Sequence, residues 1–258
     1  MTSKEGVPGT QALTKGIHVL RAIAAEGRKA YFADLMKTTG FPKPTLYRIL
    51  KALISEGLIR HEPKDGSYHL GISFLRLALQ VLKQLDIREV AHEDMIRLSD
   101  TTGEAVHLAI LDGTSVLYVD AVESTHPVGP TGRLGTQSTL HASASGKAIA
   151  ANLSSATMTR ILKALELTKF TSKTISSLDR LQKNFEHIRK CGYATNEEEE
   201  AEGIHGVAAP IFNLAGEVVG SVAVSIPSYR FQEDRMNFYA DAVKSAAKSI
   251  SSRLGKMD

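Results

Sequence analysis

The stretch Gly40-Phe-Pro-Lys-Pro-Thr-Leu-Tyr-Arg-Ile-Leu50 begins the helix that decides the fold of the N-terminal part of the chain. Proline is tolerated only in the first turn of a helix, so Pro42 and Pro44 place the start near residue 43. We expect this helix to span residues 43–56 and to end at Gly57. Its apolar residues follow the spacing i, i+3, i+4, i+7 and are Leu46, Ile49, Leu50 and Leu53. The opposite face carries three cations and a phenol, namely Lys43, Tyr47, Arg48 and Lys51.

The segments on either side complete a recognisable order of elements. Apolar periodicity predicts a helix around residues 17–24, ended by Gly27, and a second over residues 32–39. Two short strands follow, residues 58–61 and 67–70, and Asp65-Gly66 between them is a strong hairpin signal. Three helices and a hairpin predict a winged helix-turn-helix, whose third helix enters the major groove of DNA. The predicted DNA-binding residues are Lys15, Lys43, Thr45, Tyr47, Arg48, Lys51 and Lys64.

The charge distribution supports this prediction. Residues 1–72 contain eleven Lys and Arg against six Asp and Glu, whereas residues 73–258 contain twenty against twenty-two. A basic first quarter on a faintly acidic remainder favours a polyanionic partner, although ordinary solvated surface charge is the alternative. The single cysteine, Cys191, excludes an internal disulfide and a multi-cysteine metal site. No apolar run is long enough to span a bilayer and no signal peptide is evident, so we expect a cytoplasmic protein.

The length of 258 residues fits two domains. We expect a flexible arm at residues 1–11, a winged helix-turn-helix at 12–72, a linker of dimer-forming helices at 73–102 and a second domain at 103–258. The linker is apolar over more than one helical face, which is typical of a helix buried against another chain. Strands are predicted at residues 104–111, 115–122, 206–213 and 217–226, and helices at 142–153, 155–165, 178–191 and 232–254. This alternation predicts an α+β fold with a mostly antiparallel sheet.

Several ordered motifs carry a family resemblance that spans residues 11–254. They are Gln11-Ala-Leu-Thr-Lys-Gly-Ile-His-Val-Leu20, the stretch 40–50 quoted above, Glu56-Gly-Leu-Ile59, Leu140-His-Ala-Ser-Ala-Ser-Gly-Lys-Ala148, Ala208-Ala-Pro-Ile-Phe212 and Gly216-Glu-Val-Val-Gly220. Together they resemble the IclR-type transcriptional regulators. The resemblance implies a winged helix-turn-helix, a dimerising helical linker and a GAF-like effector domain. It also implies an operator in double-stranded DNA, a small-molecule effector, and a homodimer or homotetramer.

The sequence departs from the family pattern at three places in the first domain. Pro44 stands where the family commonly has serine, which removes one expected phosphate contact. Tyr31-Phe32 replaces a small polar entry to the second helix, and Lys15 stands where arginine is usual. None of these changes removes the basic face of the third helix.

The second domain lacks the patterns of several enzyme classes. Ser145-Gly146-Lys147 is similar to part of a phosphate-binding loop, but Ala148 replaces the hydroxyl residue that holds magnesium. His92-Glu93 is followed by Ile96 where a zinc protease needs a second histidine. The other histidines of this domain are scattered, so we expect no catalytic residue, no cofactor and no metal site. The alternative left open is an enzyme, or a sensor that does not bind DNA, built on a GAF-like domain.

The expected effector site begins at Ala144-Ser145-Gly146, which opens a predicted helix whose free N–H groups favour an anion such as a carboxylate. The resemblance implies the effector-binding residues Ala144, Ser145, Gly146, Asn196, Ile204, Gly206, Ala223 and Ser225. Family members often have aspartate at the position of Asn196 and cysteine at that of Gly206. Because Gly206 would open space and Asn196 removes a negative charge, we expect an effector larger and less polar than pyruvate, such as an aromatic acid or amide. The acidic run at residues 197–200 is interpreted as a solvated turn, of which one member can still face inward.

Overall fold

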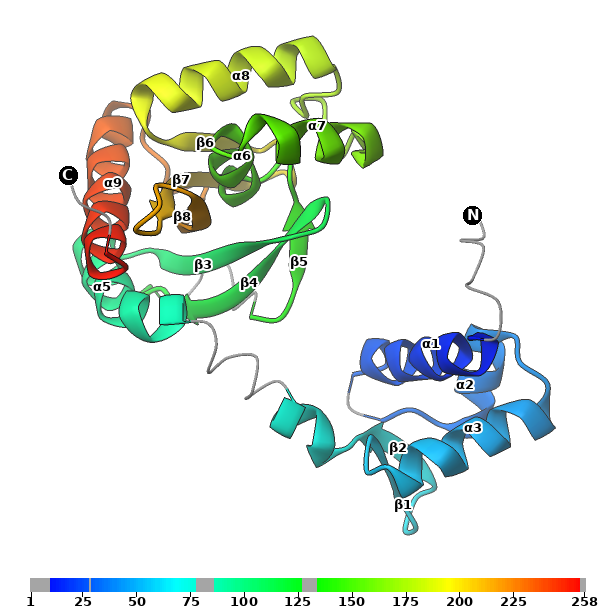
Figure 1. Ribbon diagram of the computed structural model, residues 1–258. Coiled ribbons are helices and arrows are strands. Elements are labelled where there is room, and N and C mark those ends of the chain that lie inside the picture. Colours follow the sequence, from blue (N-terminus) through cyan, green and yellow to red (C-terminus); the bar gives the residue numbers. More distant parts are fainter. Residues whose placement is uncertain (1–9, 28, 78–85, 127–133, 256–258) are drawn as a thin grey trace. The chain divides into compact units, whose positions relative to one another are not determined.

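The computed structural model describes residues 10–27, 29–77, 86–126 and 134–255 of the chain. The chain forms two compact units, divided after residue 84 (Figure 1). The first unit contains the helices α1 (Gln11–Ala25), α2 (Phe32–Thr39) and α3 (Lys43–Ser55), then the strands β1 (Ile59–Glu62) and β2 (Ser67–Leu70). Within its described residues, the second unit contains the helices α5 to α9 and one sheet.

The first unit is the predicted winged helix-turn-helix. Its three helices enclose an apolar core that includes Val19, Leu35, Leu46 and Leu50, all almost fully buried. Gly40 ends α2 in the left-handed conformation, at φ 67°, and so allows the tight turn into α3. The wing strands β1 and β2 pair antiparallel, and an isolated bridge between Ala30 and Tyr68 fixes them to the segment before α2.

The sheet of the second unit has six antiparallel strands in the order β5-β4-β3-β8-β7-β6. They are β3 (Ala105–Asp112), β4 (Ser115–Val122), β5 (Gln137–Thr139), β6 (Ala194–Glu197), β7 (Ile204–Phe212) and β8 (Val218–Pro227). The helices are α5 (Asp86–Thr102), α6 (Ala144–Ala151), α7 (Ser155–Ala164), α8 (Leu178–Cys191) and α9 (Met236–Arg253), the last preceded by a 3-10 turn (Glu233–Arg235). The α+β fold class is therefore confirmed.

Two apolar cores lie on opposite faces of the sheet, because side chains alternate along each strand. On one face, α5 and α9 pack against Val207 and Val224. On the other, α6 and α8 pack against Ala208 and Ala223. Figure 1 shows α5 and α9 together at one side of the sheet, and α6, α7 and α8 at the other.

The structure differs from the sequence predictions mainly at the edges of the sheet and in the linker. The edge strands β5 and β6 were not among the predicted strands. Gln11, assigned to the flexible arm, is the first residue of α1, and the rest of the arm except Thr10 lies outside the described residues. Residues 72–77 are helical, as expected, but residues 78–85 of the linker lie outside the described part. The C-terminal half of the linker is α5, which belongs to the core of the second unit rather than to a separate connector.

Candidate functional site

The exposed face of α3 gathers four of the seven residues predicted to bind DNA. Lys43, Tyr47, Arg48 and Lys51 are all exposed, and the Nζ atom of Lys51 lies 5.0 Å from the centroid of the Tyr47 ring. Thr45 is half-buried in the first turn of the same helix. The apolar face of α3 is buried in the core of the first unit, so the fold presents this cationic face to solvent.

The other two predicted DNA-binding residues lie on different elements. Lys15 is half-buried on α1, with its Nζ atom 6.0 Å from the ring centroid of Phe41. Lys64 is exposed in the turn of the wing. The wing is held by its neighbour Asp65, whose carboxylate accepts hydrogen bonds from Ser67 and pairs with Lys29 at 2.9 Å. These contacts hold the pKa of Asp65 far below its usual range.

A small cavity in the second unit lies between the first turn of α6 and the strands β6, β7 and β8. Its volume is about 20 Å³, which is enough for roughly one water molecule. Seven of the eight predicted effector residues line it: Ala144, Ser145, Asn196, Ile204, Gly206, Ala223 and Ser225. Strand register explains the convergence, because Asn196 and Ser225 both stand opposite Gly206 on its two neighbouring strands.

Gly146, the eighth predicted residue, does not line the cavity. A Cβ atom at this position would lie 2.3 Å from the carbonyl oxygen of Thr139 and 2.7 Å from the Cα atom of Leu140. Its backbone N–H donates a 3.0 Å hydrogen bond to Oγ of Ser143, the N-cap of α6. Gly146 is therefore needed for the close approach of α6 to the chain before it.

Two side chains of the cavity wall, Ser145 and Asn196, carry hydrogen-bonding groups. Ser145 is 1% exposed, and among the described residues its Oγ atom has no hydrogen-bond partner. The Asn196 side chain accepts a 2.7 Å hydrogen bond from the backbone N–H of Glu199. Because only the amide oxygen can accept that bond, the Nδ2 group is left as the remaining polar group of this side chain at the wall.

The expectation that Gly206 opens space is wrong. A Cβ atom on Gly206 would lie 3.3 Å from Cβ of Ala144 and 3.5 Å from Cβ of Asn196, so the absent side chain lets these walls approach each other. In this structure the cavity is consequently too small for an aromatic acid, and also for pyruvate.

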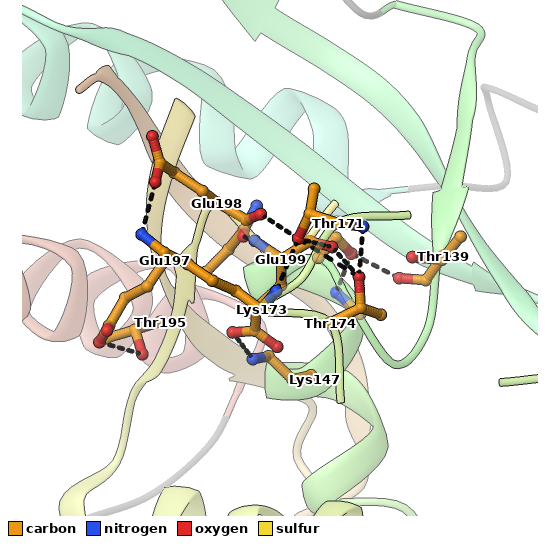
Figure 2. A network of polar contacts seen from close by, with 12 residues as sticks. Thr139, Lys147, Thr171, Lys173, Thr174, Thr195, Glu197, Glu198 and Glu199 are labelled. Carbon is orange, nitrogen blue, oxygen red and sulfur yellow. Dashed lines mark hydrogen bonds and ion pairs between the residues drawn. The ribbon is translucent and has the colours of Figure 1, made fainter. Parts of the chain in front are cut away.

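The acidic turn, residues 197–200, is not the solvated turn that the sequence predicted, because each of its four carboxylates has a protein partner (Figure 2). Glu198 pairs with Lys173 at 2.5 Å and accepts hydrogen bonds from Ser228 and the Gly203 N–H. These hydrogen bonds lower the pKa of Glu198 to about 2, and the bond from Lys173 has the largest effect. Glu200 lines the cavity and accepts a 2.5 Å hydrogen bond from Oγ of Ser138.

Glu199 is almost fully buried and forms an ion pair with Lys147, which is 1% exposed on α6. Figure 2 shows the two side chains meeting beneath the acidic turn. In the sequence, Lys147 stands in one of the family motifs and in a rejected phosphate-binding pattern, and neither assigns it a partner. An acidic run and a lysine inside an apolar helix were the available signals, but nothing in the sequence pairs them.

Three histidines and the cysteine of this unit each pack against a different part of the chain. The rings of His107, His141 and His205 pack against Tyr118, Phe170 and Phe231, respectively. Across the described ranges, no group of three or more His, Cys, Asp or Glu residues is placed to hold a metal ion. The Sγ atom of Cys191 lies 3.2 Å from the carbonyl oxygen of Tyr193, as a packing residue at the end of α8. No helix among the described residues is both long and apolar enough to cross a membrane.

A winged helix-turn-helix with a cationic third helix, on the same chain as a domain with a polar cavity, defines a DNA-binding regulator with a ligand-binding domain. The family described as the IclR helix-turn-helix domain matches residues 12–63. The family described as bacterial transcriptional regulator IclR C-terminal matches residues 79–252. The chain therefore belongs to the IclR family of bacterial transcriptional regulators.

Relatives agree with this assignment over almost the whole chain. The chain is 31% identical to the transcriptional repressor AllR of Salmonella paratyphi A, over 96% of this chain and 91% of AllR. The crystal structure of IclR from Thermotoga maritima shares 31% identity at a TM-score of 0.77, covering 94% of this chain and 98% of that one. An IclR homologue from Microbacterium hydrocarbonoxydans, crystallised with 4-hydroxybenzoate, has the same fold at 22% identity and a TM-score of 0.82, covering 95% and 99% of the two chains. AllR is a transcriptional repressor, and both matching families are those of transcriptional regulators, so the alternative of an enzyme is not supported.

Proposed function

We propose that this regulator contacts its operator through Lys43, Thr45, Tyr47, Arg48 and Lys51 of α3, with Lys15 and Lys64 as flanking contacts to the DNA backbone. The supporting observation is the single exposed face that carries the three cations of α3. Cations on one helix face suit phosphates, and arginine can also bind a guanine edge with two hydrogen bonds. A homodimer or homotetramer would present two or more such helices to the operator.

The effector proposed for the cavity carries a carboxylate or amide head on an apolar, aromatic body. The observation that carries this proposal is the unpartnered, buried Oγ of Ser145 in the first turn of α6, opposite Asn196. A buried hydroxyl without a partner costs about 1–3 kcal/mol, which a ligand oxygen would recover. The complex of a homologue with 4-hydroxybenzoate makes an aromatic acid a reasonable probe.

The cavity must widen to hold such a ligand, and that requirement couples binding to conformation. An effector shifts DNA affinity only by the difference between its affinities for the two states. Strand β8 connects the cavity to α5 over a short distance along the chain. Its residue Ala223 lines the cavity, while Val222 and Val224 belong to the core shared with α5. The helix α5 follows directly on the segment that leads from the DNA-binding unit.

The test is calorimetric titration of the purified protein with 4-hydroxybenzoate, benzamide and pyruvate, followed by a gel shift with each ligand that binds. We expect an aromatic probe to bind, Ser145→Ala to weaken it by about fivefold or more, and DNA binding without ligand to persist in that variant. Ser176→Ala, an exposed serine outside the cavity, is the matched control. Tight binding of pyruvate alone would overturn the aromatic effector. Loss of DNA binding by ligand-free Ser145→Ala would overturn the role of Ser145.

A further inference from the structure

The buried ion pair between Lys147 and Glu199 joins two opposite walls of the cavity. Lys147 lies on α6, and the first turn of that helix supplies Ala144 and Ser145 to one wall. Glu199 lies in the acidic turn that follows β6, the strand that supplies Asn196. The two charged residues are 52 positions apart in sequence, so the fold alone brings them together.

This pair is costly to bury. Burial lowers the pKa of Lys147, and burial also raises the pKa of Glu199, in each case against the effect of the partner's opposite charge. The second carboxylate oxygen of Glu199 has no hydrogen-bond partner among the described residues. A buried pair of this kind stabilises a fold little, if at all, relative to two apolar residues of similar volume. Its contribution to global stability therefore does not explain its presence.

The pair does fix a local geometry. The backbone N–H of Glu199 donates the 2.7 Å bond to the amide oxygen of Asn196, and the carbonyl of Glu199 accepts a 2.6 Å bond from Thr174. Glu198, the residue before it, has a φ of 61°, a left-handed conformation that non-glycine residues rarely adopt. Such a conformation persists only where the surrounding contacts hold it, and Figure 2 shows those contacts converging on this turn.

We propose that Lys147 and Glu199 are positioning residues that hold the acidic turn so that Asn196 offers a hydrogen-bond donor to the cavity. Because its oxygen is engaged by the Glu199 N–H, Asn196 offers a ligand chiefly the two N–H donors of Nδ2. Asn196 then favours a head group with acceptor lone pairs, a carboxylate or carbonyl, over one that only donates; the Glu200 carboxylate, which also lines the cavity, is engaged by Ser138. The part of this inference that concerns a ligand rests on the proposed function of the cavity, whereas the part that concerns Asn196 does not.

The test compares four variants of the full chain by hydrogen-exchange mass spectrometry of the peptide that contains residues 196–200. Lys147→Met combined with Glu199→Leu replaces the pair by apolar residues, and we expect it to fold with a melting temperature near that of the wild type. The amide of residue 199 should nevertheless exchange about tenfold faster, while peptides from β7 and β8 keep their protection. Lys147→Met alone should melt lower, because it leaves the Glu199 carboxylate buried and unpaired.

Two further variants keep the test decisive. Lys173→Met breaks the neighbouring, more exposed pair with Glu198, and it should leave exchange at residue 199 unchanged. Glu199→Gln preserves the shape of the side chain and removes only its charge. It replaces the double variant in the test if the double variant fails to fold, and its amide at residue 199 should also exchange faster than that of the wild type. Wild-type protection at residue 199 in the double variant, or in Glu199→Gln where the double variant does not fold, would overturn the positioning role.

A ligand measurement separates this inference from the proposed function. For the wild type, 4-hydroxybenzoate should bind at least about tenfold more tightly than benzylamine, whose head group only donates. The double variant should lose most of that preference. If the wild type binds neither probe, the proposed aromatic effector is refuted, while the exchange result still decides the role of the pair. Equal preference in the wild type and the double variant would refute the selectivity argument.

Discussion

Replacement of Arg48 by alanine should weaken operator binding by an amount that reveals what this side chain contacts. The guanidinium of Arg48 is exposed on α3 and, within the described residues, forms no ion pair, so its removal should change the free energy of unfolding by less than about 0.5 kcal/mol. If Arg48 binds a phosphate, the slope of log affinity against log salt falls by about 0.9. The loss of affinity on going from about 50 to about 200 mM salt then becomes smaller by about 3.5-fold. If Arg48 instead binds a base edge, affinity for the operator falls by about 1–3 kcal/mol, or about 5- to 150-fold, with little change in the slope.

The assay is a fluorescence-anisotropy titration of a duplex from the protein's own promoter region, repeated at several salt concentrations. An unrelated duplex of equal length measures non-specific binding. Lys183→Ala, which removes an exposed cation from α8 in the other unit, is the matched control and should leave both quantities unchanged. Gel filtration should show the oligomeric state of the wild type for both variants. Unchanged affinity and an unchanged salt slope in Arg48→Ala would refute the placement of α3 on the DNA.

Four other changes have expected outcomes. Asn196→Asp should keep the bond from the Glu199 N–H but place a carboxylate oxygen at the wall, which repels a ligand carboxylate. Calorimetry should therefore show that the ratio of the affinity for 4-hydroxybenzoate to that for benzamide is at least about tenfold lower in the variant than in the wild type. Gly146→Ala should destabilise the second unit by about 1–3 kcal/mol or more in denaturant titrations, because the new methyl group meets backbone atoms. By contrast, Gly16→Ala, in the open middle of α1, should stabilise the first unit by about 0.5–1 kcal/mol. Glu198, whose pKa is lowered from 4.5 to about 2, stabilises the fold above pH 4.5 and loses that effect as the pH falls towards 2. Glu198→Gln should therefore flatten the fall of the melting temperature over this pH interval, and an equally steep fall in the variant would contradict the assignment.

Much of the fold could be predicted from sequence because its signals are local. Helices α2 and α8 and strands β2 and β4 have the predicted boundaries, since each combines clear periodicity with a glycine or a turn at its end. The strands β5 and β6 could not be found in this way. Gln137-Ser-Thr139 is short and polar, and Ala194–Glu197 lacks the alternating apolar residues of a half-buried strand. Both are defined by backbone pairing with a neighbouring strand, which depends on the order of strands in the sheet.

The cavity was predicted through family motifs rather than through local chemistry, and this difference explains what was missed. Motifs identified the residues of the wall one by one, but not the distances between them. The effect of Gly206 was therefore misjudged, because an absent side chain can bring walls together as readily as it can open space. Lys147 and the acidic turn were each interpreted alone, as part of a false motif and as a solvated loop. A charged residue is expected at a surface unless a partner is known, and here the partner is supplied by a helix and a turn from distant parts of the chain. Buried charge is thus the feature of this domain that most requires the three-dimensional structure, and it is also where the contacts that orient Asn196 are concentrated.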